Sequence, residues 1–359
     1  MQRLEDFTLY QNPDPLLVSR QATFPGIVQV ADGDLVAIFS IGQAFDAADN
    51  RAHVSRSTDN GSTWSPPVRL NAHEPKPEES ESFKPLLLRD GTLIATGYVF
   101  VRPTALAPVV DPTTFKLLRL RNKVSRSTDG GRSWTVPAYF DIDGEPLELS
   151  GPCIELASGR IIGAAAPFHL GKTGHAGWIV ASDDRGHSWR KLSEFYRAAG
   201  GHVSTWESRL CEYAPDKVAV IFWAYDNALG VNLNNHIVFS NDGGQTFGAA
   251  RDTGIKGQAS NLMPLGGDKL LTIHAHREAP VGLVVRRIDI TNGGFEVEEE
   301  LDLFKNDAMG SDTADIKKQF GSLKFGQPSL LRLKNEELLA ACWSFEQGQY
   351  VIKGYKIAL

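Results

Sequence analysis

A stretch of thirteen residues occurs almost unchanged at two places in this chain. SRSTDNGSTWSPP begins at Ser55, and SRSTDGGRSWTVP begins at Ser125. Two weaker copies follow, ASDDRGHSWRKL from Ala181 and FSNDGGQTFGAA from Phe239. The shared pattern is Ser-x-Asp-x-Gly-x-Ser/Thr-Trp/Phe, and the steps between its aspartates are 70, 55 and 58 residues; these aspartates are Asp59, Asp129, Asp184 and Asp242. Self-similarity of this kind predicts a fold built from repeated units.

The chemistry of this motif is that of a turn. An aspartate side chain accepts hydrogen bonds from backbone N–H groups a few residues further on, and the glycine supplies a positive φ. The large ring that closes the motif can be buried between layers of the fold; it is Trp64, Trp134, Trp189 or Phe247. We therefore interpret the motif as a structural hairpin turn whose aspartate is already occupied.

A second period runs through the whole chain. Six segments each combine an apolar strand, a polar turn and another apolar strand, and successive markers lie 60, 67, 55, 53 and 68 residues apart; the markers are Pro25, Pro85, Pro152, Glu207, Ser260 and Pro328. Each unit then has a third and a fourth strand, with the aspartate turn between them in the first four units. This organisation predicts an all-β fold, a six-bladed β-propeller of four-stranded blades, with residues 1–359 as a single domain.

The last unit indicates how the ring closes. After LLAACWS only one further strand, YVIKGYKIAL, precedes the end of the sequence, so the sixth blade lacks one strand. The N-terminal RLEDFTLYQNP belongs to no unit of its own. We expect this N-terminal strand to complete the last blade, because pairing both ends of the chain removes a free sheet edge.

Composition excludes several classes of partner. The net charge is −6 and no run of Lys and Arg resembles a nucleic-acid footprint, so we expect no nucleic-acid partner. No apolar run approaches membrane-spanning length, and MQRLEDFTLYQ has no apolar signal-peptide core. The three cysteines lie within apolar strand runs, which favours buried free thiols. We expect a cytoplasmic protein that does not bind a membrane.

The four aspartate turns on a six-bladed pattern resemble the Asp-box (BNR) repeats of the sialidase (neuraminidase) superfamily, and the resemblance covers essentially the whole chain. It implies a site with a tyrosine nucleophile, a glutamate that activates it, an aspartate acid/base, and three arginines that clamp the substrate carboxylate.

Two carboxylates match this pattern. Asp46 lies in SIGQAFDAADNRAHVSRS, eleven residues before Ser57, where the family has its acid/base, and Asp49 is the second choice. Glu207, in STWESRLCEY, begins the inner strand of the fourth unit, where the family has its glutamate. The structural alternatives are an ordinary loop aspartate for Asp46 and, for Glu207, a salt bridge with Arg209.

The nucleophile and most of the arginine clamp are not matched. FGQPSLL places Gln327 or Pro328 where the family has its tyrosine; Tyr225 is the nearest alternative along the chain but belongs to another blade. ATFPG has no arginine at the first clamp position, IFWAYD has none at the second, and Arg277 in HAHREAP is the match for the third. A triad of planar guanidinium groups recognises the sialic carboxylate through bidentate hydrogen bonds. Because only one of the three arginines is matched, ordinary sialoside hydrolysis is disfavoured.

Most of the remaining candidates are side chains at the ends of the inner two strands of each unit, and the cations Arg51, Lys84 and Arg277 could hold the carboxylate of an acidic sugar. Aromatic rings among carboxylates, amides and a few cations are typical of a sugar pocket. The predicted substrate-binding residues are Arg51, Lys84, Trp206, Trp223, Tyr225, His274, His276, Arg277 and Gln327. His274 and His276 share a strand face and provide half of a metal site, but no third ligand has suitable spacing. We predict neither a metal nor a cofactor.

These observations favour a glycoside hydrolase, or a related carbohydrate-active enzyme, that acts on a non-sialic sugar, with acidic sugars included. Asp46 is the predicted acid and Glu207 the predicted base or nucleophile, and both retention and inversion stay open. Two alternatives remain: a non-catalytic propeller that binds a sugar or a protein, and an exo-sialidase with an unusual site. The expected partner is a small carbohydrate or glycoside; the sequence sets no oligomeric state.

Overall fold

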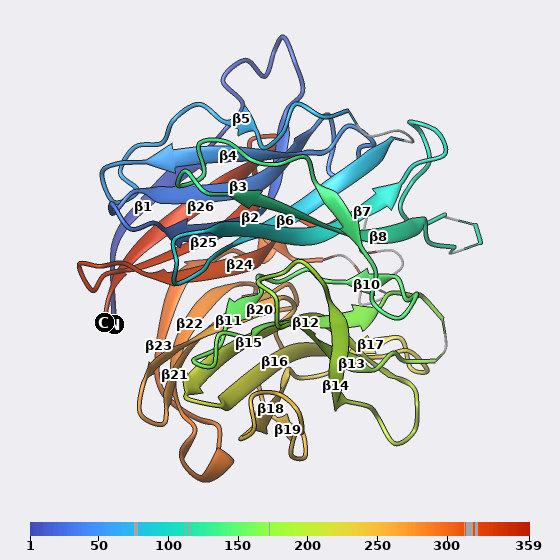
Figure 1. Cartoon of the computed structure of the whole chain (residues 1–359), viewed down its shortest axis with the longest axis vertical. Helices are drawn as coiled ribbons and strands as arrows, with labels where there is room; N and C mark the ends of the chain where they lie inside the picture. The colour runs from blue at the N-terminus through green and yellow to red at the C-terminus, as the bar shows by residue number, and fades with distance from the viewer. Residues whose placement is uncertain are drawn as a thin grey trace.

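The chain folds into six antiparallel sheets arranged as the blades of a propeller, which confirms the predicted fold class. The structure is a computed structural model and describes the chain except residues 75–77, 112, 115, 172, 312, 314–318 and 320–321. Figure 1 shows the blades following one another around a ring, from blue at the N-terminus to red at the C-terminus.

The first three blades contain the repeats that are most alike. Blade one consists of β2 (Gln21–Gln29), β3 (Leu35–Gly42), β4 (Arg51–Ser57) and β5 (Val68–Arg69). Blade two consists of β6 (Glu79–Leu87), β7 (Leu93–Val101), β8 (Arg119–Ser127) and β9 (Ala138–Phe140). In blade three the inner strand is split into β10 (Leu147–Glu148) and β11 (Ile154–Glu155), followed by β12 (Ile161–Pro167), β13 (Gly177–Ser182) and β14 (Arg190–Tyr196).

The other three blades follow the same plan. Blade four consists of β15 (Val203–Ala214), β16 (Lys217–Asp226), the short β17 (Val231–Asn232), β18 (His236–Ser240) and β19 (Arg251–Asp252). Blade five consists of β20 (Ser260–Gly266), β21 (Lys269–His276), β22 (Gly282–Asp289) and β23 (Glu296–Lys305), with two 3₁₀ turns, η1 (Thr291–Gly293) and η2 (Asp307–Met309), nearby. Blade six consists of β24 (Phe325–Arg332), β25 (Leu338–Glu346), β26 (Gln349–Ala358) and β1 (Gln2–Tyr10).

The N-terminal strand closes the ring, as predicted. β1 pairs antiparallel with β26 from Gln2 opposite Ala358 to Tyr10 opposite Ile352. The two chain ends therefore lie side by side at the edge of blade six (Figure 1). This pairing supplies the fourth strand that the sixth repeat lacks and protects the outer edge of β26.

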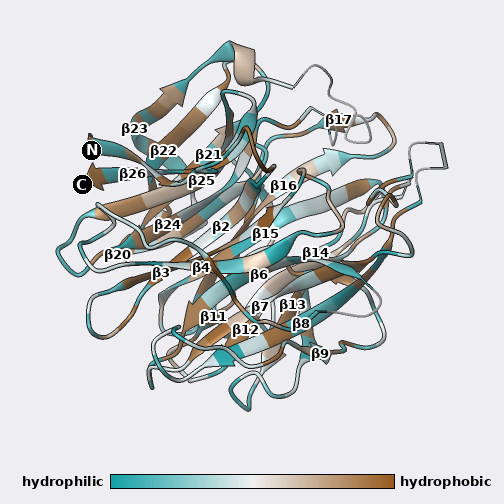
Figure 2. Cartoon of the chain, turned by 90° about the horizontal axis from the view of Figure 1, so that it is seen from above, coloured by the Kyte–Doolittle hydropathy of each residue, from teal (hydrophilic) through white to brown (hydrophobic). Residues whose placement is uncertain are grey.

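The core lies between neighbouring blades. Every residue of β3 is buried, and apolar side chains of blades one and six share one cluster that includes Phe39, Leu339 and Trp343. Figure 2 shows apolar colouring along the strands, with many of the connecting loops hydrophilic. The three cysteines, Cys153, Cys211 and Cys342, are free and buried in these clusters. Among the described residues, no helix is long and apolar enough to span a membrane.

The four aspartate turns share one hydrogen-bond pattern. In the first, Asp59 accepts from the backbone N–H of Thr63 at 2.8 Å and from its hydroxyl at 2.6 Å. Trp64 donates from its indole nitrogen to the carbonyl of Gly61 at 3.0 Å. The equivalent carboxylate bonds recur at the other three turns. These bonds lower the pKa of Asp59 to about 2, as expected for a carboxylate that is occupied by its own turn.

Candidate active site

A cavity of about 390 Å³ opens at the inner strands of the propeller. Its lining is mainly aromatic. One wall, from blades one and six, contains Phe24, Phe45 and Trp343, with 5.2 Å between the ring centroids of Phe45 and Trp343. The opposite wall, from blades two to four, is formed by Tyr98, Phe100, Phe168, Trp206 and Trp223. Two facing aromatic walls suit a flat or ring-shaped ligand whose polar groups are fixed by a few side chains.

Three inner strands carry a β-bulge at the same place, where they reach this cavity. The register shifts between Thr23 and Gly26 in β2, between Trp206 and Arg209 in β15, and between Gly326 and Ser329 in β24. Each bulge contains a non-glycine residue with a positive φ: 59° at Phe24, 44° at Glu207 and 41° at Gln327. A side chain in this conformation costs about 1–3 kcal/mol, and bulges re-aim side chains, so these three positions are candidates for function.

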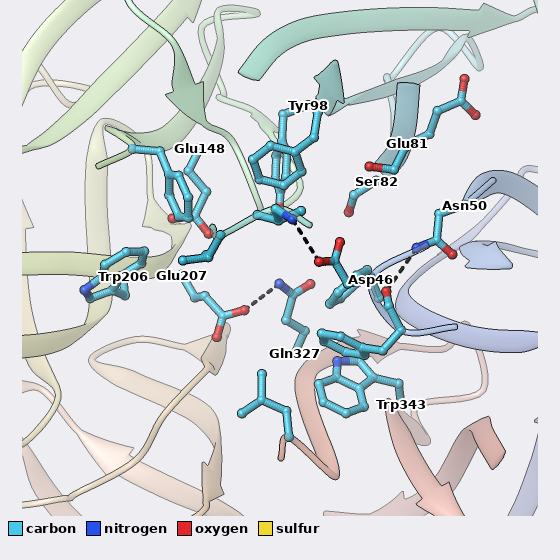
Figure 3. A pocket seen from close by; sticks show the side chains of 18 of the residues that line it. Asp46, Asn50, Glu81, Ser82, Tyr98, Glu148, Trp206, Glu207, Gln327 and Trp343 are labelled. Atoms are coloured by element: carbon cyan, nitrogen blue, oxygen red, sulfur yellow. Dashed lines mark hydrogen bonds between the residues drawn. The ribbon is translucent and has the colours of Figure 1, made fainter. Parts of the chain in front are cut away.

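Two of these bulge residues are hydrogen-bonded to each other. The side-chain amide of Gln327 donates to Glu207 Oε1 at 2.5 Å (Figure 3). Glu207 Oε2 and Gln327 Oε1 are buried and have no hydrogen-bond partner among the described residues. A buried carboxylate oxygen without a partner is costly, so this position is suited to accept a hydrogen bond or a proton from a ligand.

A second carboxyl group, Glu148, lines the cavity beside Glu207. Glu148 ends β10 and is 7% exposed. Burial, followed by the charge of Glu207, raises its pKa to about 8. The buried guanidinium of Arg209 opposes this rise, as do hydrogen bonds from Ser150 and from the backbone of Glu207. The site therefore holds two carboxyl groups whose environments differ.

Asp46 lies on the other side of the cavity, on blade one. In Figure 3 its carboxylate lies apart from Glu207, as expected because blades one and four face each other in a ring of six. Both oxygens are hydrogen-bonded: Oδ1 accepts from Arg102 at 2.5 Å and Oδ2 from the backbone N–H of Val109 at 2.9 Å. The Arg102 side chain is 1% exposed and also donates to the carbonyl of Ala107. Asp46 thus holds the 102–109 segment against the cavity.

Four of the predicted substrate-binding residues line the cavity together with Asp46 and Glu207; they are Trp206, Trp223, Arg277 and Gln327. Arg277 is buried, and its Nε donates to the carbonyl of Phe325 at 2.8 Å. Its guanidinium carbon lies 5.8 Å from the ring centroid of Trp343. Burial lowers the pKa of Arg277, and the charge of Glu207 opposes this change.

The other five predicted binding residues do not line this cavity. Lys84 lines a second cavity of about 200 Å³, donates to the carbonyl of Phe24 at 2.6 Å, and has a pKa far below its usual value because of burial. Arg51 is bonded to the carbonyls of Ala48, Asn50 and Glu79.

Tyr225 packs with Trp206 and Trp223 behind the cavity wall. The ring nitrogens of His274 bond to Asn235 and Thr272, and His276 bonds to Arg286. No group of three or more His, Cys, Asp or Glu among the described residues is placed to hold a metal ion.

Several lining residues were not predicted from the sequence; they include Phe45, Tyr98, Arg102, Glu148, Phe168 and Trp343. Glu148 lies at the start of the inner strand of blade three, which is interrupted between β10 and β11. The sequence marker for that unit, Pro152, lies after Glu148, so the strand entry was placed too late to include it. Trp343 occupies the far end of a second strand, the position that identified Trp223 in blade four. The far end of the second strand is therefore the sequence position from which Trp343 could have been predicted.

The comparisons with known proteins support the fold. No protein-family model matches the chain, and no curated protein matches it. A Dyadobacter fermentans protein of unknown function superimposes with a TM-score of 0.77 at 23% identity, covering 99% of this chain and 98% of that chain. The Hadza microbial sialidase Hz136 gives 0.71 at 17% identity, covering 99% of this chain and 68% of that one.

The NanB sialidase of Streptococcus pneumoniae gives a TM-score of 0.64 at 12% identity, covering 98% of this chain and 70% of that chain. Identities this low support the fold and leave activity to be argued from the site. The chain therefore has a sialidase-like propeller fold.

Proposed function

We propose that this protein is a glycoside hydrolase, or a related carbohydrate-active enzyme, with its active site in the aromatic cavity. The observation that carries the proposal is the Glu207 carboxylate: one oxygen is fixed by Gln327, and the other is buried without a partner. A positioned carboxylate at a sugar-sized, aromatic-lined cavity is the arrangement that glycoside hydrolysis requires of a base or nucleophile.

The aromatic walls give the site its affinity for a sugar. Phe24, Phe45 and Trp343 offer one set of ring faces, and Trp206 and Trp223 another, for stacking on the pyranose ring. Arg277 supplies a buried positive charge at the same cavity. We propose that this guanidinium binds the carboxylate of an acidic sugar, such as a uronate, because Arg donates in a planar geometry that matches a carboxylate.

The carboxyl chemistry differs from that implied by the sialidase resemblance. Gln327 stands beside Glu207 where the family has its tyrosine nucleophile, and an amide does not attack an anomeric carbon. In the proposed mechanism Glu207 itself is the base that activates water, or the nucleophile. Asp46, the residue that the resemblance implies as the acid, lies across the cavity with both of its oxygens hydrogen-bonded.

The test is a hydrolysis screen on aryl glycosides, including uronides and a sialoside, with wild type, Glu207→Gln and Glu296→Gln. Glu296 is an exposed residue of the outer strand β23 and serves as the matched control. We expect turnover of at least one glycoside by wild type and by the control, and a loss of about 10²-fold or more in Glu207→Gln. A sialoside as the sole substrate would instead support an exo-sialidase.

A non-catalytic, sugar-binding propeller is the second candidate. It is favoured by Gln327 in place of a nucleophile and by the two hydrogen bonds that occupy both oxygens of Asp46. Calorimetric titration with the same sugars separates the candidates. Binding that persists in Glu207→Gln, together with a screen in which no glycoside is cleaved, would support the binding protein.

A further inference from the structure

Glu148 and Glu207 form a pair of neighbouring carboxyl groups at one end of the cavity (Figure 3). The Ser150 side chain and the backbone of Glu207 lie close enough to the Glu148 carboxyl to lower its pKa. Tyr98, on β7, also faces this pair and lines the cavity. Glu148 therefore lines the cavity and lies close to the segment that carries Glu207.

The cations around this pair are shared unequally. The ionisable groups that influence Glu148 are Glu207 and Arg209, and burial, followed by the charges of Glu148 and Glu207, raises the pKa of the Tyr98 hydroxyl. Arg209 is 2% exposed and interacts with both carboxyl groups, whereas Arg277 and Lys84 also interact with Glu207. Two neighbouring buried carboxyl groups favour the state in which one keeps its proton, and Glu148 is the one that has only a shared cation beside it.

The surroundings place that proton on Glu148. Glu148 is more deeply buried than Glu207, which is only partly buried, and its pKa of about 8 leaves it mainly protonated at neutral pH. Asp46 is committed to other contacts. Both of its oxygens accept hydrogen bonds, and its carboxylate forms an ion pair with the buried guanidinium of Arg102.

We propose that Glu148, rather than Asp46, is the proton donor of the site. This inference rests on the proposed function. The Glu148 carboxyl gives its proton to the glycosidic oxygen as the bond from that oxygen to the anomeric carbon breaks. Water forms the new bond to the anomeric carbon and loses a proton to Glu207. Return of that proton from Glu207 to Glu148 through water restores both groups, so one water is consumed for each bond cleaved.

Leaving groups of different basicity test this role. The variants are Glu148→Gln, Asp46→Asn and, as an exposed control from the same blade, Glu145→Gln. We expect Glu148→Gln to lose about 10²- to 10⁴-fold in kcat/KM on alkyl glycosides, but at most about tenfold on dinitrophenyl glycosides, which need no proton. The kcat/KM of wild type is expected to fall as the pH rises through the Glu148 pKa of about 8, and Glu148→Gln should not show this fall. Asp46→Asn should slow both substrate classes by a similar factor.

The proposal would be overturned, and the acid assigned to Asp46, if Asp46→Asn lost much more kcat/KM on alkyl than on dinitrophenyl glycosides and Glu148→Gln showed no such difference.

An infrared difference spectrum of wild type minus Glu148→Gln provides a readout that needs no turnover. We expect the carbonyl band of a protonated carboxyl group at about pH 6, lost as the pH rises through the Glu148 pKa of about 8. Absence of this band overturns the proposal even if glycosides are cleaved. Presence of the band with no glycoside cleaved shows that the proposed function has failed, and the donor role with it.

Discussion

Gln327 and Glu207 lie 120 residues apart in the chain, and a 2.5 Å hydrogen bond joins their side chains. Each residue sits in a β-bulge of an inner strand, with a positive φ that a non-glycine residue rarely adopts. Two bulges from different blades therefore converge on one contact. The bulges position a carboxylate at the cavity and hold one of its oxygens, which leaves the other free for chemistry.

Gln327→Leu is expected to reduce kcat/KM about tenfold or more on any glycoside that the wild type cleaves. The change removes the donor that orients Glu207 and leaves Oε1 without its partner, a loss of about 1–3 kcal/mol. Steady-state kinetics measure the effect, with Gln2→Leu on the outer strand β1 as the control. Equal activity in Gln327→Leu and wild type would show that the hydrogen bond does not position Glu207.

The Asp46–Arg102 pair is expected to stabilise the loop over the cavity. Asp46→Asn leaves the buried Arg102 guanidinium without its counter-charge and is expected to lower the free energy of unfolding by about 1–3 kcal/mol. Arg102→Gln should cost a similar amount, and the double variant should cost less than the sum of the two. Urea unfolding of the four proteins measures this coupling. Additive losses would mean that the two side chains do not stabilise each other.

Glu148 is expected to make stability depend on pH. Its folded-state pKa of about 8 lies above its ordinary value of 4.5. Its contribution to stability is therefore fully present below about pH 4.5 and is lost as the pH rises through about 8, because the folded state binds the proton more tightly. Glu148→Gln keeps a neutral side chain and should become more stable relative to wild type over this range. Urea unfolding at several pH values tests this, and parallel curves for the two proteins would contradict it.

The aspartate turns are expected to matter for stability and not for catalysis. Trp189 is buried, donates to the carbonyl of Gly186 and stacks on Phe140 with 5.1 Å between ring centroids. Trp189→Ala should lower the free energy of unfolding by about 3–5 kcal/mol, and Trp189→Phe by less. The Trp189→Phe protein, when folded, should retain the kcat of wild type. A large loss of kcat in this variant at unchanged stability would give the turn a part in the site.

The sequence predicted the repeat architecture because turn chemistry is local. Asp59 and Thr63 lie four residues apart and bond to each other, so the motif is visible in one short stretch. Glu207 and Gln327 could be identified because they occupy matching places in repeated inner strands. Their contact could not be predicted, because it depends on how two bulges bring blades four and six together.

Other parts of the site depend on contacts between distant segments. Asp46 and Arg102 are 56 residues apart, and their ion pair follows from the way a loop of blade two folds over blade one. Lys84 was expected in the cavity because it lies on an inner strand. The register of β6 with β7 has no bulge, unlike those of β2, β15 and β24, and Lys84 lines the second cavity instead. Glu148 was overlooked because the inner strand of blade three is interrupted.

The most direct test of the central claim is chemical rescue of Glu207→Ala with formate or azide, on the aryl glycoside that the wild type cleaves fastest. The variant lacks the carboxylate but keeps the aromatic walls, so a small anion can enter the vacated space. We predict a loss of about 10²-fold or more that added anion restores in part and in proportion to its concentration. Turnover by Glu207→Ala equal to that of wild type, with or without the anion, would contradict the claim that Glu207 performs the chemistry.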